Sequence, residues 1–280
     1  MAPKGYCDMK KTKKWITNIL LVVFALIFVV SAVMVVDYVI KSFQANSQKN
    51  DLLDLKNNPP HLTLEEPTKG PADATAPSGP TEPAEPGILP EYRALYEINS
   101  DLVGWVTVPG TRIDYPVMQT DRENDYYLHR DFYREYSSHG MVFAEEDADV
   151  EDSDVVTIYG HNKDDGTMFG DMDEYWSYDF YKDNKVIYFD TLLHRYEYEI
   201  ITVFNTTATL GEGYEYHTFI DAESELDFDR YIANVERLAL YDTGVSAEYG
   251  DHLLVLSTCE YSQVNGRLVI VAKRVGEVEK

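Results

Sequence analysis

One stretch of this chain of 280 residues, from Trp15 to Val36, contains no charged side chain, and it constrains the architecture most. About twenty apolar residues in a row suffice to cross a bilayer as a helix. Four lysines between residues 10 and 14 precede the stretch, and such clusters remain on the cytoplasmic side. We therefore expect a cytoplasmic N-terminus over residues 1–14, a single-pass transmembrane signal anchor over residues 15–40, and an extracellular remainder.

A cleaved signal peptide is the competing interpretation of this apolar stretch. Its apolar core would span roughly 7 to 15 residues and end at a small-residue cleavage site. The stretch here is longer, and residues 33–38 hold no Ala-x-Ala pattern. A lipoprotein is disfavoured because Cys7 comes before the apolar residues instead of after them.

Composition changes sharply beyond the anchor. Nine of the twelve prolines fall between residues 46 and 90, among many small polar residues and few aromatic ones. A segment of this composition buries too little apolar surface to fold, so we expect residues 41–87 to form a Pro-rich acidic tether that mixes polyproline II with coil. Residues 88–280 are then long enough for one compact extracellular domain with its own core.

The charge balance limits the partners of this domain. The whole chain has 24 Lys and Arg residues against 49 Asp and Glu residues, a net charge of −25. Such an acidic surface excludes a nucleic-acid partner, which requires a basic patch. Neither a Cys/His spacing typical of a zinc site nor a glycine-rich phosphate loop occurs, so we expect no metal and no cofactor.

The domain is predicted to be mainly β. Runs rich in β-branched and aromatic residues predict seven or eight strands, and their number favours a closed or nearly closed barrel. Helical spacing predicts a short helix at 90–99 and longer ones at 168–178 and 223–240. The runs that predict strands are 105–108, 140–143, 154–159, 185–189, 195–204, 252–258 and 267–274.

Cys259 is the residue whose chemistry most needs an explanation. The other cysteine, Cys7, lies on the opposite side of the predicted membrane, so Cys259 is expected to be an unpaired thiol in an oxidising compartment. It ends one predicted strand and Arg267 begins the next, so a hairpin-like connection would bring sulfur and guanidinium together. An arginine there can stabilise an oxyanion and lower the pKa of the thiol.

A proton donor is also needed if Cys259 attacks a peptide. His161 is the best candidate of the seven histidines because it follows a buried-looking strand in a polar turn, Gly160-His161-Asn162. Each residue has a simpler interpretation: a lone cysteine is more often a buried apolar group, and a lone histidine more often completes a turn. These patterns alone fit a cysteine enzyme and a folded adhesion domain equally well.

Three motifs carry a resemblance to a known family. Leu256-Ser257-Thr258-Cys259, followed eight positions later by Arg267, resembles the active-site signature of the sortases, and Tyr159 to Asn162 resembles their histidine motif. Residues 104–117 and the long helix before the cysteine strand are similar to class B sortases in particular. The resemblance covers about residues 89–275, nearly the whole outer domain.

The resemblance implies a closed eight-stranded sortase-type β-barrel with an N-terminal helix and a long helix before the cysteine strand. It also implies a cysteine transpeptidase in which Cys259 forms a thioacyl intermediate. His161 would protonate the leaving amine, and Arg267, together with a backbone N–H near Glu260, would hold the oxyanion. Ser257, Thr258 and Glu260 flank the nucleophile and are expected to contact substrate. No Asn or Asp stands out as a third orienting residue.

The implied partners are secreted proteins with a C-terminal sorting signal similar to Asn-Pro-x-Thr-Asn. The signal is cut after Thr and the protein joined to an amine of peptidoglycan or its lipid-linked precursor. Three alternatives stay open: a pilin-polymerising sortase, a hydrolytic cysteine protease, and a surface binding domain without catalysis.

Overall fold

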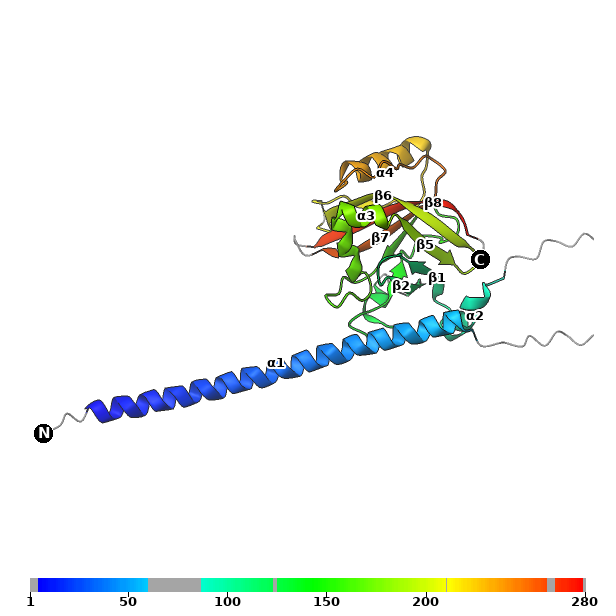
Figure 1. Cartoon of the computed structure of the whole chain (residues 1–280). Coiled ribbons are helices and arrows are strands. Elements are labelled where there is room, and N and C mark those ends of the chain that lie inside the picture. The colour runs from blue at the N-terminus through cyan, green and yellow to red at the C-terminus, as the bar shows by residue number, and fades with distance from the viewer. Residues whose placement is uncertain (1–4, 60–86, 123–124, 210, 261–264, 279–280) are drawn as a thin grey trace, which may run out of the picture. The chain divides into compact units, whose positions relative to one another are not determined.

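The computed structural model describes residues 5–59, 87–122, 125–209, 211–260 and 265–278. Helix α1 runs unbroken over Gly5–Asn57, and every residue from 15 to 40 is exposed (Figure 1). It is long and apolar enough to cross a membrane. The chain divides into two compact units, residues 1–45 and residues 46–280.

The structure differs from the expected tether over residues 41–57, which are helical. No proline or glycine occurs between residues 41 and 58, so nothing interrupts the helix until Pro59. Within the second unit, Leu52 of this helix is 1% exposed and packs with residues of the domain. The folded unit therefore includes residues well before the expected boundary at 88. The proline-rich residues 60–86 lie outside the described part of the chain.

The second unit is built on a closed eight-stranded barrel with strand order β1-β2-β3-β4-β7-β8-β6-β5. Most neighbours are antiparallel, whereas β2 with β3 and β4 with β7 are parallel. The predicted closed barrel is therefore confirmed, as a mixed one. The strands are β1 Leu102–Thr107, β2 Asp114–Met118, β3 Val142–Ala144, β4 Val155–Tyr159, β5 Val186–Thr191, β6 Arg195–Thr207, β7 Leu253–Glu260 and β8 Gly266–Glu277.

Strand β2 is the one that the sequence patterns did not predict. It has five residues with Pro116 in the middle, and proline weakens a strand assignment because it has no N–H. The structure tolerates Pro116 because β2 pairs with β3 only through Val117 and Met118, so Pro116 faces a single neighbouring strand, β1.

The helices largely follow the expected positions. The predicted helix at 168–178 is instead a 3-10 helix that leads into a short α-helix. The predicted helix at 223–240 forms as α4, Glu225–Arg237, and the Ser224 side chain caps it by accepting from the backbone N–H of Asp227. The remaining helices are α2 Pro90–Ile98 and α3 Tyr178–Asp183, with 3-10 helices η1 Tyr126–His129, η2 Gly170–Trp176 and η3 Tyr216–Thr218.

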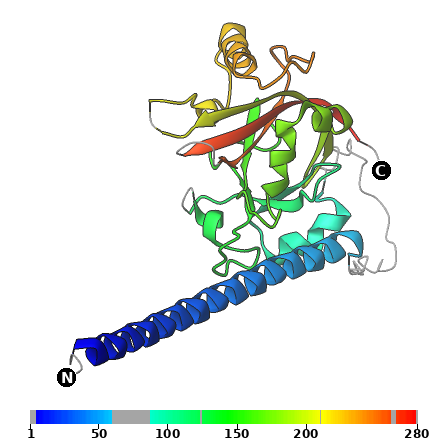
Figure 2. The ribbon, with the colours of Figure 1, turned by 60° about the vertical axis from the view of Figure 1, so that its left-hand side comes forward.

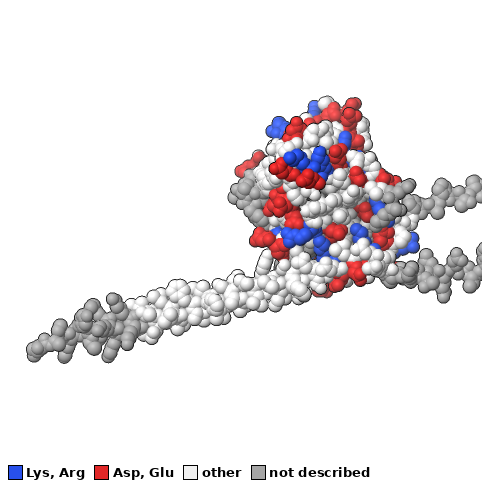
Figure 3. Space-filling view, viewed as in Figure 1, with Lys and Arg blue, Asp and Glu red and all other residues white. Residues whose placement is uncertain are grey.

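Three apolar clusters hold the domain together. One fills the barrel interior, and a second lies between α4 and the outer face of β7 and β8, where Phe228 and Val235 are fully buried. The third joins residues 52–55 of α1 to α2 and β1, which lie side by side in Figure 2, and it buries Tyr92 and Trp105. Charged groups stay outside these clusters. Acidic side chains spread over the face of the domain in Figure 3, with basic ones among them.

Candidate active site

The two parallel strands β4 and β7 run in register, and their C-terminal ends bring two of the expected residues to one edge of the barrel. Tyr159 pairs with Ser257, so His161 and Cys259 each lie two residues beyond the same register point. The backbone N–H of Gly160 donates to the carbonyl of Ser257 at 3.1 Å. A side chain at Gly160 would place Cβ 2.6 Å from the ring of Phe169, so this turn requires glycine.

The antiparallel pair of β7 and β8 brings in the third residue. Cys259 and Arg267 are direct partners in this register, and side chains of directly opposed residues lie on the same face of a sheet. The Arg267 guanidinium donates through Nη1 to the carbonyl of Gly266 at 2.9 Å, which holds it at the start of β8. The sequence-based expectation that Cys259 and Arg267 come together is met.

A single cavity of about 480 Å³ contains His161, Cys259 and Arg267 in its wall. Cys259 is a free cysteine of intermediate exposure, so its sulfur is not sealed in the core. Four carboxylate residues also line the wall: Asp125, Glu145, Glu146 and Glu215. Among the residues that the structure describes, no three His, Cys, Asp or Glu side chains gather as metal ligands. The arrangement offers a thiol, an imidazole and a fixed cation to one bound molecule.

His161 is oriented by a backbone group. Its Nε2 lies 2.8 Å from the carbonyl oxygen of Leu128. A carbonyl only accepts, so Nε2 carries the hydrogen and Nδ1 is left to exchange a proton. Burial lowers the pKa of His161; the Leu128 carbonyl acts against this, and the positive charge of Lys163 lowers the pKa further.

A family model described as the Sortase domain matches residues 106–275 of the chain. The chain is 36% identical to sortase B of Listeria monocytogenes over 188 residues, which cover 66% of this chain and 74% of that protein. It is 32% identical to sortase B of Staphylococcus aureus over 189 residues, 66% of this chain and 75% of that protein.

This chain belongs to the sortase family.

The barrel agrees with solved class B structures. The structure of a Staphylococcus aureus sortase B–substrate complex matches with a TM-score of 0.62 and 31% identity, over 69% of this chain and 88% of that one. The resemblance inferred from the motifs is thereby confirmed, and this sortase is a cysteine transpeptidase of the class B type.

The residues that flank Cys259 are held by the fold of this sortase. Ser257 and Thr258 both line the cavity, yet both are at most 2% exposed. The Ser257 hydroxyl lies 2.5 Å from that of Tyr216, and the Thr258 hydroxyl donates to the carbonyl of Gly160 at 2.7 Å. These hydroxyls are therefore already engaged within the protein. The side chain of Glu260 lies outside the described part.

Sequence reasoning missed several groups around these residues. The Leu128 carbonyl lies 33 positions before His161 and acts through the backbone, so no side-chain pattern could reveal it. Asn162 lies inside the histidine motif, and its Nδ2 donates to the carbonyl of Cys259 at 3.0 Å. The Asp173 carboxylate accepts from the same Nδ2, and nothing in the sequence distinguishes Asp173 among 49 acidic residues.

Proposed function

We propose that this sortase is a membrane-anchored transpeptidase that cleaves a C-terminal sorting signal and transfers the protein to an amine of peptidoglycan. Cys259, His161 and Arg267 carry the reaction. The observation that supports this most is that one strand edge and one cavity hold all three residues, with Cys259 and Arg267 in direct register.

In the first step, Cys259 is the thiolate and His161 is protonated; the thiolate sulfur bonds to the carbonyl carbon of the signal's Thr, and its negative charge passes to the carbonyl oxygen. The guanidinium of Arg267 stabilises that oxyanion because it stays positive at any working pH. The C–N bond then breaks, and the leaving amine takes a proton from His161. A thioester on Cys259 remains.

In the second step, an incoming amine attacks the thioester carbon and gives its proton to His161. A new amide bond forms, the C–S bond breaks, and Cys259 leaves as the thiolate beside a protonated His161, which restores the starting state. The carboxylates in the cavity wall support an amine acceptor, because negative charge attracts an approaching ammonium group. Water in place of the amine would make the enzyme a hydrolase.

Three further features support the rest of the proposal. The apolar residues 15–40 are suited to an anchor, and the lysines before them support a cytoplasmic N-terminus with an extracellular domain. One similar structure is a Staphylococcus aureus sortase B–substrate complex, which supports a peptide substrate here. We take a signal of the Asn-Pro-x-Thr-Asn kind as the first substrate to test.

The test uses the full chain in detergent with fluorogenic peptides that carry Asn-Pro-x-Thr-x or Leu-Pro-x-Thr-Gly. Each peptide is offered with and without an added amine, beside Cys259→Ala. Cleavage after Thr, lost in the variant and diverted to an amine-linked product, is expected. Cleavage to the free acid alone would identify a hydrolase, and amine transfer only to a pilin lysine would identify a pilin polymerase. No cleavage, together with a Cys259 that does not react with a thiol probe, would favour a binding domain.

A further inference from the structure

Asn162 directly follows His161, and its side chain connects that residue to the nucleophile. The side chain is buried, with Asn162 6% exposed. Its Nδ2 lies 3.0 Å from the backbone oxygen of Cys259, and 3.0 and 3.1 Å from the two carboxylate oxygens of Asp173. A carbonyl and a carboxylate only accept, so both amide hydrogens are committed to these partners.

The bond to Cys259 continues the parallel ladder beyond the end of β4. The last backbone bond of that ladder joins the N–H of Gly160 to the carbonyl of Ser257. If the ladder continued by two residues along both strands, its next bond would join the backbone N–H of residue 162 to the carbonyl of Cys259. The strand has ended by then, and the side chain of Asn162 supplies the missing donor.

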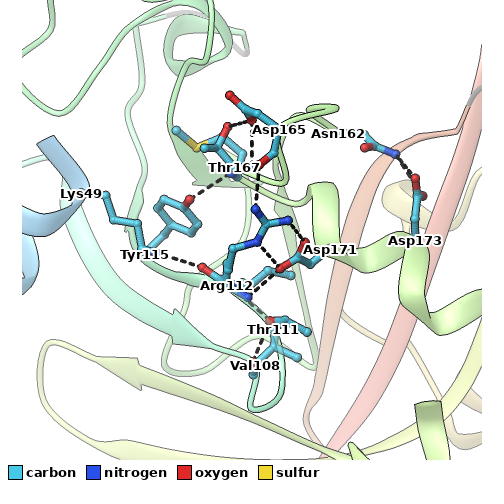
Figure 4. A network of polar contacts seen from close by, with 12 residues as sticks. Lys49, Val108, Thr111, Arg112, Tyr115, Asn162, Asp165, Thr167, Asp171 and Asp173 are labelled. Atoms are coloured by element: carbon cyan, nitrogen blue, oxygen red, sulfur yellow. Dashed lines mark hydrogen bonds and ion pairs between the residues drawn. The ribbon is translucent and has the colours of Figure 1, made fainter. Parts of the chain in front are cut away.

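Asp173 is itself held in place. It lies on η2, and Asp171 on the same 3-10 helix binds the guanidinium of Arg112, with Nη2 to Oδ1 at 2.6 Å and Nε to Oδ2 at 2.9 Å. Figure 4 shows this clamp and, apart from it, the pair of Asn162 and Asp173. Because Arg112 belongs to the turn between β1 and β2, this clamp ties the 3-10 helix that carries Asp173 to the barrel.

The orientation of the Cys259 carbonyl matters because the backbone N–H of Glu260 lies in the same peptide plane. The peptide unit is planar and trans, so the N–H of Glu260 points opposite to the carbonyl of Cys259. Rotation of that plane would turn the Cys259 carbonyl and the Glu260 N–H together. One hydrogen bond to the carbonyl therefore sets the direction of the next amide and holds the end of the strand that carries the nucleophile.

We propose that Asn162, held by Asp173, is a positioning residue that keeps the Cys259–Glu260 peptide aligned for attack on the substrate carbonyl. This role rests on the proposed function, and it places Asn162 behind the nucleophile instead of against the substrate. Misalignment of reacting groups by about 1 Å costs on the order of a hundredfold in rate.

The test compares four full-length proteins in detergent: wild type, Asn162→Ala, Asp173→Asn and the matched control Asn184→Ala. Asn184 also donates Nδ2 to a backbone carbonyl, that of Phe180 at 2.9 Å, but this carbonyl lies on α3 and not on the nucleophile. We measure kcat and KM with the best peptide of the panel, the melting temperature, and the rate at which iodoacetamide alkylates Cys259.

We expect Asn162→Ala to lower kcat by about 10- to 100-fold with KM within about twofold. Its melting temperature should fall no further than that of Asn184→Ala, whose kcat should equal that of wild type. Asp173→Asn keeps one acceptor for the amide, so its kcat should lie between those of wild type and Asn162→Ala. Iodoacetamide needs no aligned peptide, so its alkylation rate should change by less than about threefold.

Equal kcat values in wild type and Asn162→Ala would overturn the positioning role while leaving the proposed function intact. A change in KM or melting temperature alone would also overturn it. If Asn162→Ala does not fold, a wild-type kcat in Asp173→Asn would overturn the role in its place. If wild type and Asn184→Ala cleave no peptide although Cys259 is alkylated, the proposed function fails first, and the role of Asn162 with it.

Discussion

The strand edge at Cys259 and the contact between α1 and α2 stabilise the domain in different ways. At the edge, backbone carbonyls and amide groups fix half-buried side chains, as the Leu128 carbonyl does for His161. At the contact, Leu52, Tyr92 and Trp105 are almost fully buried against one another. We therefore expect substitutions at the strand edge to lower the catalytic rate with little loss of stability. Substitutions at the contact between α1 and α2 should lower stability with little change in the catalytic rate.

The largest expected effect is at His161. His161→Ala removes the group that we propose as proton donor to the leaving amine, and general acid catalysis contributes about 10²- to 10⁴-fold. We expect kcat/KM to fall by that amount in the peptide assay, with the melting temperature nearly unchanged. His194→Ala is the control, because His194 binds Glu151 and is not in the cavity wall. A wild-type rate for His161→Ala would refute the acid assignment.

Arg267→Lys should have the next largest effect. Lysine keeps the charge but loses the planar fork of donors that we propose to hold the oxyanion, and loss of one oxyanion donor costs about 10²- to 10³-fold in kcat. We therefore expect a drop of about a hundredfold with normal thermal stability. Arg274→Lys on the same strand, where the guanidinium lies 4.4 Å from the ring of Tyr196, should keep full activity. Equal activity of both variants would show that Arg267 serves only the fold.

Leu52→Ala tests the other side of the comparison. Removal of a fully buried leucine side chain costs about 2–5 kcal/mol. We expect the free energy of unfolding of the domain to fall by that amount in denaturant titration, while kcat of the folded protein stays unchanged. Leu226→Ala on α4, where the side chain is 59% exposed, should cost under about 1 kcal/mol. A stability of Leu52→Ala equal to wild type would mean that residues 46–57 do not pack on the domain in solution.

The smallest expected effect is a shift in the titration of His161. Burial is the main cause of its lowered pKa, and the charge of Lys163 adds to it. Lys163→Ala should therefore raise the pKa towards, but not beyond, the ordinary 6.5, as measured by NMR titration of the imidazole.

The sign of the linked stability follows from this lowered pKa. The native state favours neutral His161, so its contribution to stability is complete above about pH 6.5 and is lost as pH falls through the native pKa. That loss should be smaller in Lys163→Ala. A downward shift of the pKa in the variant would contradict this electrostatic explanation.

The sequence predicted those parts of the fold that have a local pattern. The β-branched runs marked seven of the barrel strands, and the spacing of Cys259 and Arg267 indicated their pairing. Strand β2 was not predicted because Pro116 disfavours a strand. Only the tertiary structure shows that Pro116 pairs with a single neighbouring strand. Residues 41–57 are helical although the composition of residues 41–87 predicts a tether, because the prolines that give this composition begin only at Pro59.

The sequence predicted only those residues of the candidate site whose side chains are chemically distinctive. Cys259, His161 and Arg267 are chemically distinctive and close to strand ends. The Leu128 carbonyl is a backbone group, and Asn162 and Asp173 gain meaning only when β4 and β7 are placed side by side. Such contacts depend on tertiary register, which no single stretch of sequence contains.

The most direct test of the central claim is the intact mass of the full-length protein after brief exposure to the peptide that it cleaves best. We expect an adduct of the N-terminal peptide fragment, mapped to Cys259 by digestion, that disappears when an amine is added and never forms in Cys259→Ala. Cleavage without any adduct, or an adduct on another residue, would contradict a thioacyl transpeptidase at this site.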